Sequence, residues 1–114
     1  MLALFGFEGM VWADKAKTKP LSDGYFIRCV NTRNKKWDAE SLGVEEGTFP
    51  REGHYSLCLA DFQNNDAVKL GDVIEFYLFK KPGHEKLIDL GTKRIDSSHL
   101  KNAGIALEFV VEDK

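Results

Sequence analysis

Apolar and polar residues alternate over most of this chain, in segments that turn residues separate. The last segment places Glu108 on one side, and on the opposite side it places Ile105, Leu107, Phe109 and Val111. A period of two is typical of a β-strand with one buried and one solvated face. Several such strands joined by short turns predict an all-β fold of two antiparallel sheets packed face to face.

The same pattern predicts about seven strands: Leu4–Ala13, Tyr25–Asn31, one that begins at Lys36, His54–Ala60, Asp72–Lys80, Lys86–Ile95 and 105–112. Both faces of Asp72–Lys80 are largely apolar, which predicts a central or covered strand. An irregular loop is expected from Asp38 to Gly53, with one helical turn over Asp38–Gly43. A turn is expected at Lys81–His84. Asp96 is predicted to cap a short helical turn that ends near Gly104. Irregular crossovers between the strands favour a two-sheet sandwich over a closed barrel.

The 114 residues suit a single domain, 1–114, with a formal net charge of −2. A near balance of charges argues against a general nucleic-acid surface. The short basic stretch Arg33–Lys36 is interpreted as a solvated hairpin tip. No apolar run is long enough to span a bilayer. The apolar start, Met1–Phe7, lacks a basic region and is interpreted as a strand rather than a signal peptide.

The alternation pattern places the two cysteines on opposite kinds of strand face. Cys29 shares a face with Ile27, whereas Cys58 shares a face with His54 and Ser56. One thiol therefore points inward and the other outward. Because a disulfide needs Cβ atoms within about 3.5–4.5 Å of each other, we expect two free thiols.

Candidate chemical sites are few. Oxygen-bearing side chains gather between Asp61 and Asp72, but their spacing does not match a calcium loop. The histidines show no zinc spacing, so no metal and no cofactor is expected. Asp96 and the residues after it are better explained by helix capping than by catalysis. Cys58 stays open as a nucleophile, in a third hypothesis of a small enzyme or redox protein.

Aromatic residues on faces interpreted as outer give the binding candidates Trp12, Trp37 and Tyr77. Exposed aromatic rings stack on sugars or become buried against protein partners. The alternative is that these rings cover the second face of a sheet against a loop or a neighbouring domain.

Four motifs resemble carboxypeptidase-regulatory-like and related prealbumin-type sandwich modules. They are Phe7–Trp12 with its Gly-x-Val, Lys19–Tyr25 with its Pro-x-x-x-Gly, Gly53–Phe62 with its Gly-x-Tyr, and Gly71–Phe76 with its Gly-Asp. The resemblance implies an Ig-like sandwich of the prealbumin type that serves as a non-catalytic accessory module of a larger secreted, periplasmic or surface protein. The long Asp38–Gly53 stretch and the two cysteines depart from that pattern.

The expected function is therefore structural or protein-binding, with a protein partner or a neighbouring domain as the other component. A carbohydrate-binding module that uses the exposed aromatic rings is the alternative. No nucleic acid is expected as a partner, and the expected location is extracellular or periplasmic.

Overall fold

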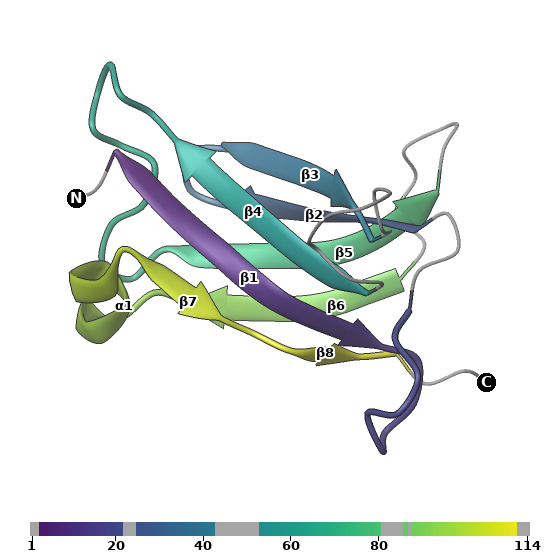
Figure 1. The fold of residues 1–114 in the computed structure, drawn as a ribbon. Coiled ribbons are helices and arrows are strands. Elements are labelled where there is room, and N and C mark those ends of the chain that lie inside the picture. Colours follow the sequence, from purple (N-terminus) through teal and green to yellow (C-terminus); the bar gives the residue numbers. More distant parts are fainter. Residues whose placement is uncertain (1–2, 22–24, 43–52, 81–85, 87, 112–114) are drawn as a thin grey trace, which may run out of the picture.

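The alternating segments form two β-sheets in the computed structural model, which describes residues 3–21, 25–42, 53–80, 86 and 88–111 (Figure 1). One sheet has the order β4-β1-β7, with β8 also paired to β1, and the other has the order β3-β2-β5-β6. The strands are β1 (Leu4–Trp12), β2 (Tyr25–Asn31), β3 (Trp37–Ser41), β4 (His54–Ala60), β5 (Val73–Lys80), β6 (Ile88–Arg94), β7 (Gly104–Ala106) and β8 (Phe109–Val110). One short helix, α1 (Ser97–Asn102), precedes β7. The predicted all-β architecture with two sheets is confirmed.

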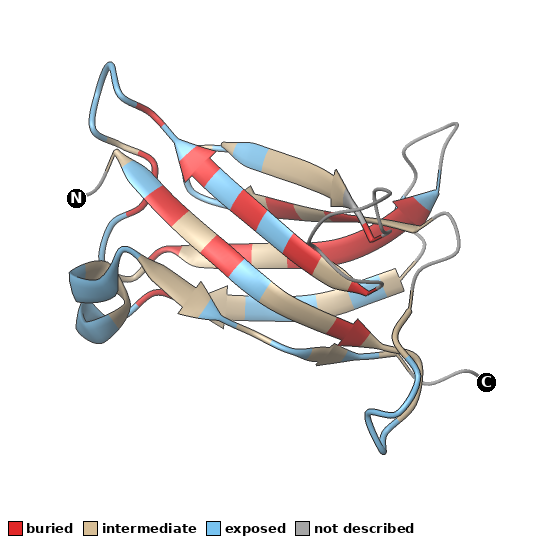
Figure 2. Cartoon of the chain, in the orientation of Figure 1, coloured by how far each residue is buried: buried red, intermediate tan, exposed pale blue. Residues whose placement is uncertain are grey.

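Alternate side chains of the two sheets fill the space between them. In Figure 2, buried segments alternate with half-buried and exposed ones along β1 and β4. Full burial of a Phe or Leu side chain stabilises the fold by roughly 1.5–3 kcal/mol. The fully buried large residues include Phe5, Phe7, Tyr55, Leu57 and Phe76. As its two apolar faces predict, β5 is an inner strand, paired with β2 on one side and β6 on the other.

The helical turn predicted over Asp38–Gly43 is wrong. Residues 37–41 form β3, which returns antiparallel to β2 directly after a hairpin and pairs Trp37 with Val30. The side chains of Asp38 and Glu40 extend from β3 to the edge of β4. They accept the backbone N–H groups of Cys58 and Ser56, each at 2.8 Å. These carboxylates occupy hydrogen-bonding groups that an unpaired strand edge would otherwise expose.

The C-terminal stretch differs from the expected single antiparallel strand, because β7 and β8 are separate and both run parallel to β1. The break lies at Leu107, opposite Gly9. Gly9 has φ +155°, and a Cβ there would lie 1.8 Å from the carbonyl oxygen of Leu107. Tyr55 of β4 donates its hydroxyl to the same carbonyl at 2.8 Å. The close approach and this side-chain bond account for the interruption. Only the β3-β2-β5-β6 sheet is fully antiparallel.

Several smaller predictions are confirmed. Asp96 is the N-cap of α1 and accepts the backbone N–H of His99 at 3.0 Å. Cys29 is buried and Cys58 is exposed, and both are free thiols. The predicted turn at Lys81–His84 and most of the loop that leads to Gly53 lie outside the described residues.

Substitution of Gly9 by alanine tests the contact with Leu107. We expect Gly9→Ala to lower the free energy of unfolding by about 3 kcal/mol or more, because a methyl group would overlap the carbonyl. Gly91→Ala is the matched control: Gly91 also has positive φ (+101°) but nothing within 4 Å of the added Cβ. Its expected cost is only the backbone strain of about 1–2 kcal/mol. Urea unfolding followed by circular dichroism measures both, and equal losses would contradict the steric explanation.

Candidate functional site

Two of the predicted binding aromatics meet on the outer face of the β3-β2-β5-β6 sheet, with an arginine between them. Arg28 of β2 lies opposite Ala39 of β3 and Tyr77 of β5. Its guanidinium carbon lies 3.8 Å from the centre of the Trp37 ring, and its Nη1 donates to the Tyr77 hydroxyl at 3.0 Å. Because Ala39 is small, the arginine side chain has room to lie between the rings. We call Trp37, Arg28 and Tyr77 the Trp37 platform.

The members of this platform differ in exposure. Trp37 is 57% exposed, whereas Tyr77 is only 8% exposed. The ring of Phe79 lies 6.2 Å from that of Tyr77, and the Lys86 ammonium lies 5.6 Å from it. Tyr77 therefore holds Arg28 in place by accepting its hydrogen bond, while Trp37 presents the accessible surface. The expectation that Tyr77 is itself an exposed ring does not match this burial, since neighbouring side chains cover it.

Trp12 does not join the platform. It is the last residue of β1, in the other sheet, and lies at the opposite end of the sandwich from the start of β3 (Figure 1). Its indole Nε1 donates to Glu108 at 2.6 Å, and the Lys17 ammonium lies 3.6 Å from the same carboxylate. The bond from Trp12 and the nearby lysine hold the pKa of Glu108 below its usual value. Trp12 thus fastens the C-terminal stretch to β1.

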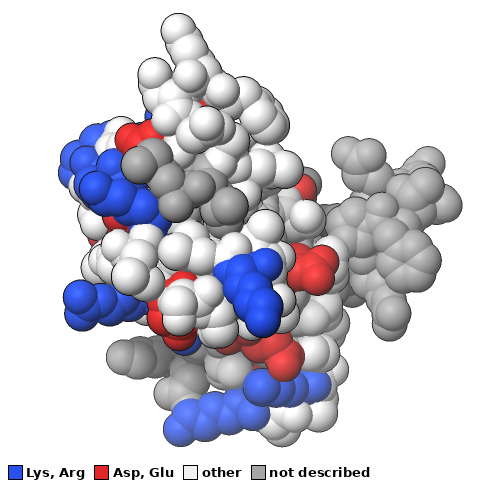
Figure 3. Space-filling view, turned by 90° about the vertical axis from the view of Figure 1, so that its left-hand side faces the viewer, with Lys and Arg blue, Asp and Glu red and all other residues white. Residues whose placement is uncertain are grey.

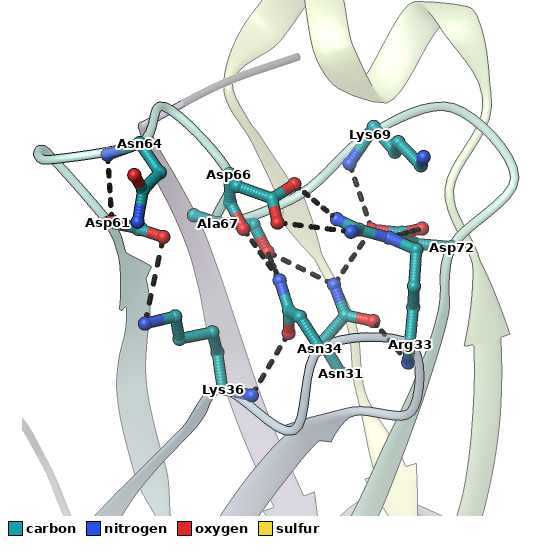
Figure 4. Close-up of polar contacts among 10 residues, drawn as sticks. All are labelled: Asn31, Arg33, Asn34, Lys36, Asp61, Asn64, Asp66, Ala67, Lys69 and Asp72. Carbon is teal, nitrogen blue, oxygen red and sulfur yellow. Dashed lines mark hydrogen bonds and ion pairs between the residues drawn. The ribbon is translucent and has the colours of Figure 1, made fainter.

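The basic stretch is an exposed hairpin tip, as predicted, but Arg33 is also held there by two carboxylates (Figure 4). Its Nη2 and Nε lie 2.7 Å from Asp66 and Asp72, respectively. Asn34 donates to the carbonyl of Asp66 at 2.6 Å, and Asn31 donates to Asp72 at 2.8 Å. These contacts join the hairpin of β2 and β3 to the crossover loop between β4 and β5. We call these five residues the Arg33 network.

Asp72 is the buried centre of this network, with 4% of its surface exposed. Burial by itself raises its pKa, but hydrogen bonds from Arg33, Asn31 and the Lys69 backbone outweigh that effect, so the pKa of Asp72 lies below its usual value. The carboxylates of this oxygen-rich loop are therefore occupied by protein donors. Within the described residues there is no group of three or more metal-ligating side chains.

The groups considered for catalysis are partly buried or take part in the helix cap. Burial raises the pKa of the Cys58 thiol, and the charge of Asp38 adds to this effect. A cysteine nucleophile needs a lowered pKa, so this environment works against that role. Burial raises the pKa of Cys29 to about 12. The Ser98 hydroxyl donates to Asp96 at 2.8 Å within the helix cap.

The alternation pattern gave no sign of a hollow of about 340 Å³ on the outer face of the other sheet. Gly6 and Gly104 are direct partners in β1 and β7 and form its floor, since neither carries a side chain. Glu8, Ser56 and Asn102 line it. Two glycines on separate strands give no recognisable motif, so only their pairing shows the hollow.

Comparison with protein-family models, with curated proteins and with solved structures finds no match to this chain. Among the described residues, no helix is long and apolar enough to cross a bilayer.

Removal of the buried carboxylate tests the Arg33 network. We expect Asp72→Ala to lower the free energy of unfolding by about 3 kcal/mol at pH 7, because it leaves buried donors without a partner. The lowered pKa means that the carboxylate stabilises the fold above its unfolded pKa of about 3.9, and that this contribution is lost as the pH falls through the folded value. Urea unfolding should therefore show the difference from wild type shrinking below about pH 4.

Asp66→Ala is the control for this substitution, since Asp66 pairs with the same arginine but is more exposed. Its expected cost is at most about 1 kcal/mol. Equal effects of the two substitutions at pH 7 would contradict a special role of the buried carboxylate.

Thiol reactivity tests the interpretation that neither cysteine is an activated nucleophile. We expect the Cys58 thiol to react with a disulfide probe slowly at pH 7, with a midpoint above about 8.5 in the pH–rate profile. Cys29 should react only when the protein unfolds, because it is buried. Cys58→Ser assigns the faster reaction. A rapid reaction of Cys58 below pH 7 would instead restore the nucleophile hypothesis.

Proposed function

We propose that this chain is a non-catalytic β-sandwich module that binds a protein partner through the Trp37 platform. The observation that carries the proposal is an exposed tryptophan whose ring is stacked on a guanidinium, which in turn is fixed by a buried tyrosine. Tryptophan, tyrosine and arginine are the residue types that dominate binding energy at protein interfaces. A platform whose side chains are already held in place loses less conformational entropy on binding.

The surroundings of the platform support a protein partner. Phe26 stacks on Phe79 at 5.4 Å on the same outer face, and the Lys86 ammonium lies 3.3 Å from Glu75. Phe79 is only 2% exposed, so the accessible surface of this face combines the Trp37 ring with charged groups, as protein-binding sites do. We further infer an Ig-like sandwich of the prealbumin type, working in a larger secreted, periplasmic or surface protein. The motifs that resemble such modules support this inference.

Carbohydrate binding is the second candidate, because the large exposed area of Trp37 suits stacking on a sugar ring. The arrangement of the other rings favours it less. Tyr77 is buried and Trp12 lies on the other sheet, so the three predicted aromatics do not form a row of exposed rings.

We test the proposal by selecting peptides that bind the protein and then removing the Trp37 ring. Random 12-residue peptides displayed on phage are selected against the immobilised protein and then measured against Trp37→Ala. We expect most selected peptides to lose affinity by about 30-fold, which corresponds to the roughly 2 kcal/mol of an interface hot spot. Thermal unfolding should change little, because Trp37 is mostly exposed.

Val110→Ala is the control, since it shortens another exposed apolar side chain, on β8 of the other sheet. A selection in which no peptide depends on Trp37 would contradict the proposal. Calorimetric titration with cellohexaose, chitohexaose and xylohexaose tests the second candidate. Saturable binding of one of these sugars that depends on Trp37 would show that the platform binds carbohydrate instead of a protein.

A further inference from the structure

Three connecting segments and the first residue of β1 meet at one end of the sandwich, the end that carries α1. We define this loop end as Leu4 together with residues 32–36, 61–72 and 94–103. Backbone hydrogen bonds join its parts: Asp61 N–H donates to the Ala3 carbonyl at 2.7 Å, and Gly71 N–H donates to the Ile95 carbonyl at 2.9 Å. The Arg33 network joins the hairpin to the crossover loop. Figure 3 shows this end of the molecule from outside.

The loop end carries an unusual share of the exposed apolar surface. Phe62 is 72% exposed, Leu70 is 63% exposed and Leu4 is 47% exposed. These are three of the five large apolar residues that are exposed in the described part of the chain. Single exposed apolar residues are ordinary, but several at one end indicate an interaction surface.

The charge of this end differs in sign from that of the whole chain, which has a net charge of −2. The loop end carries four carboxylates, Asp61, Asp66, Asp72 and Asp96, and six cations, Arg33, Lys35, Lys36, Lys69, Arg94 and Lys101. In Figure 3 blue side chains project over this end, with red groups between them.

Internal ion pairs and the helix cap use all four carboxylates of the loop end. Arg33 takes up two carboxylates, Lys36 lies 3.6 Å from the carboxylate of Asp61, and Asp96 caps α1. Within the described residues, no carboxylate forms an ion pair with Lys35, Arg94 or Lys101. The loop end therefore presents unpaired positive charge beside exposed apolar side chains, on loops that the Arg33 network holds in place.

We propose that the loop end is a second docking surface, separate from the Trp37 platform, and that it binds a protein segment carrying carboxylates beside apolar side chains. Charge complementarity identifies this occupant: its carboxylates pair with the free lysines, and its apolar side chains cover Phe62 and Leu70. Nearby polar residues distinguish a protein from a membrane. Exposed amides at Gln63, Asn64 and Asn65 follow Phe62 directly, and they would lose their hydrogen bonds in hydrocarbon.

The probe is a synthetic 12-residue peptide in which Asp and Glu alternate with Phe and Leu, titrated into the ¹⁵N-labelled protein. We expect amide shift changes confined to 32–36, 61–72 and 94–103. The matched peptide, with Lys and Arg in place of the acids, should bind at least tenfold more weakly. Affinity should also fall as salt rises, because exposed charges are screened.

Two variants complete the test: Phe62→Ser/Leu70→Ser removes the apolar part, and Lys35→Glu/Lys101→Glu reverses the charge of two unpaired lysines. Each variant should weaken binding of the acidic peptide at least tenfold. All four side chains are exposed, so near-ultraviolet circular dichroism should confirm an unchanged fold. Trp37→Ala should bind this peptide like wild type, which separates the outcome from that of the Trp37 platform. Equal binding of both peptides, or shifts elsewhere on the protein, would overturn the proposal. So would binding to phosphatidylserine vesicles with no binding of the peptide.

Discussion

The carboxylate of Asp72 is the constraint on which both candidate surfaces depend. A buried charge is tolerated only when donors surround it, and here Arg33, Asn31 and the Lys69 backbone provide them. These donors come from the β2–β3 hairpin and the crossover loop, so satisfying one carboxylate fixes the two segments against each other. Trp37 begins the strand directly after that hairpin. The platform and the loop end therefore share one internal support.

A second constraint is the position of β1 between three other strands. It pairs antiparallel with β4 along most of its length, and parallel with β7 and β8 on its other edge. Gly9 allows the C-terminal stretch to approach closely at the break, and Tyr55 holds the carbonyl of Leu107 there. The outer face of this sheet carries small residues such as Gly6 and Gly104, whereas the outer face of the other sheet carries aromatic rings. This difference places the platform on the β3-β2-β5-β6 sheet.

The sequence predicted which side of a strand each residue faces better than what covers that side. Arg28 and Tyr77 are on the outer face, as alternation requires, yet only Trp37 of the platform presents a large exposed ring. The alternation of apolar and polar residues shows on which face of its own strand a side chain lies. Whether that side chain is buried depends on side chains from neighbouring strands. The same limit explains Arg33: the sequence placed it on an exposed hairpin tip, but it did not show the carboxylates that meet it there, more than thirty residues away.

The sequence by itself determined the all-β class, the strands β2 and β4, the inner position of β5, the helix cap at Asp96 and the facing of both cysteines. Each follows from local periodicity or from a side chain that bonds its own backbone, and both act over a few residues. Only the tertiary structure decided that the last segment breaks and runs parallel to β1, and that 37–41 is a strand. It also decided that Arg28 joins Trp37 to Tyr77. These outcomes depend on contacts between residues far apart in the chain, which no local pattern encodes.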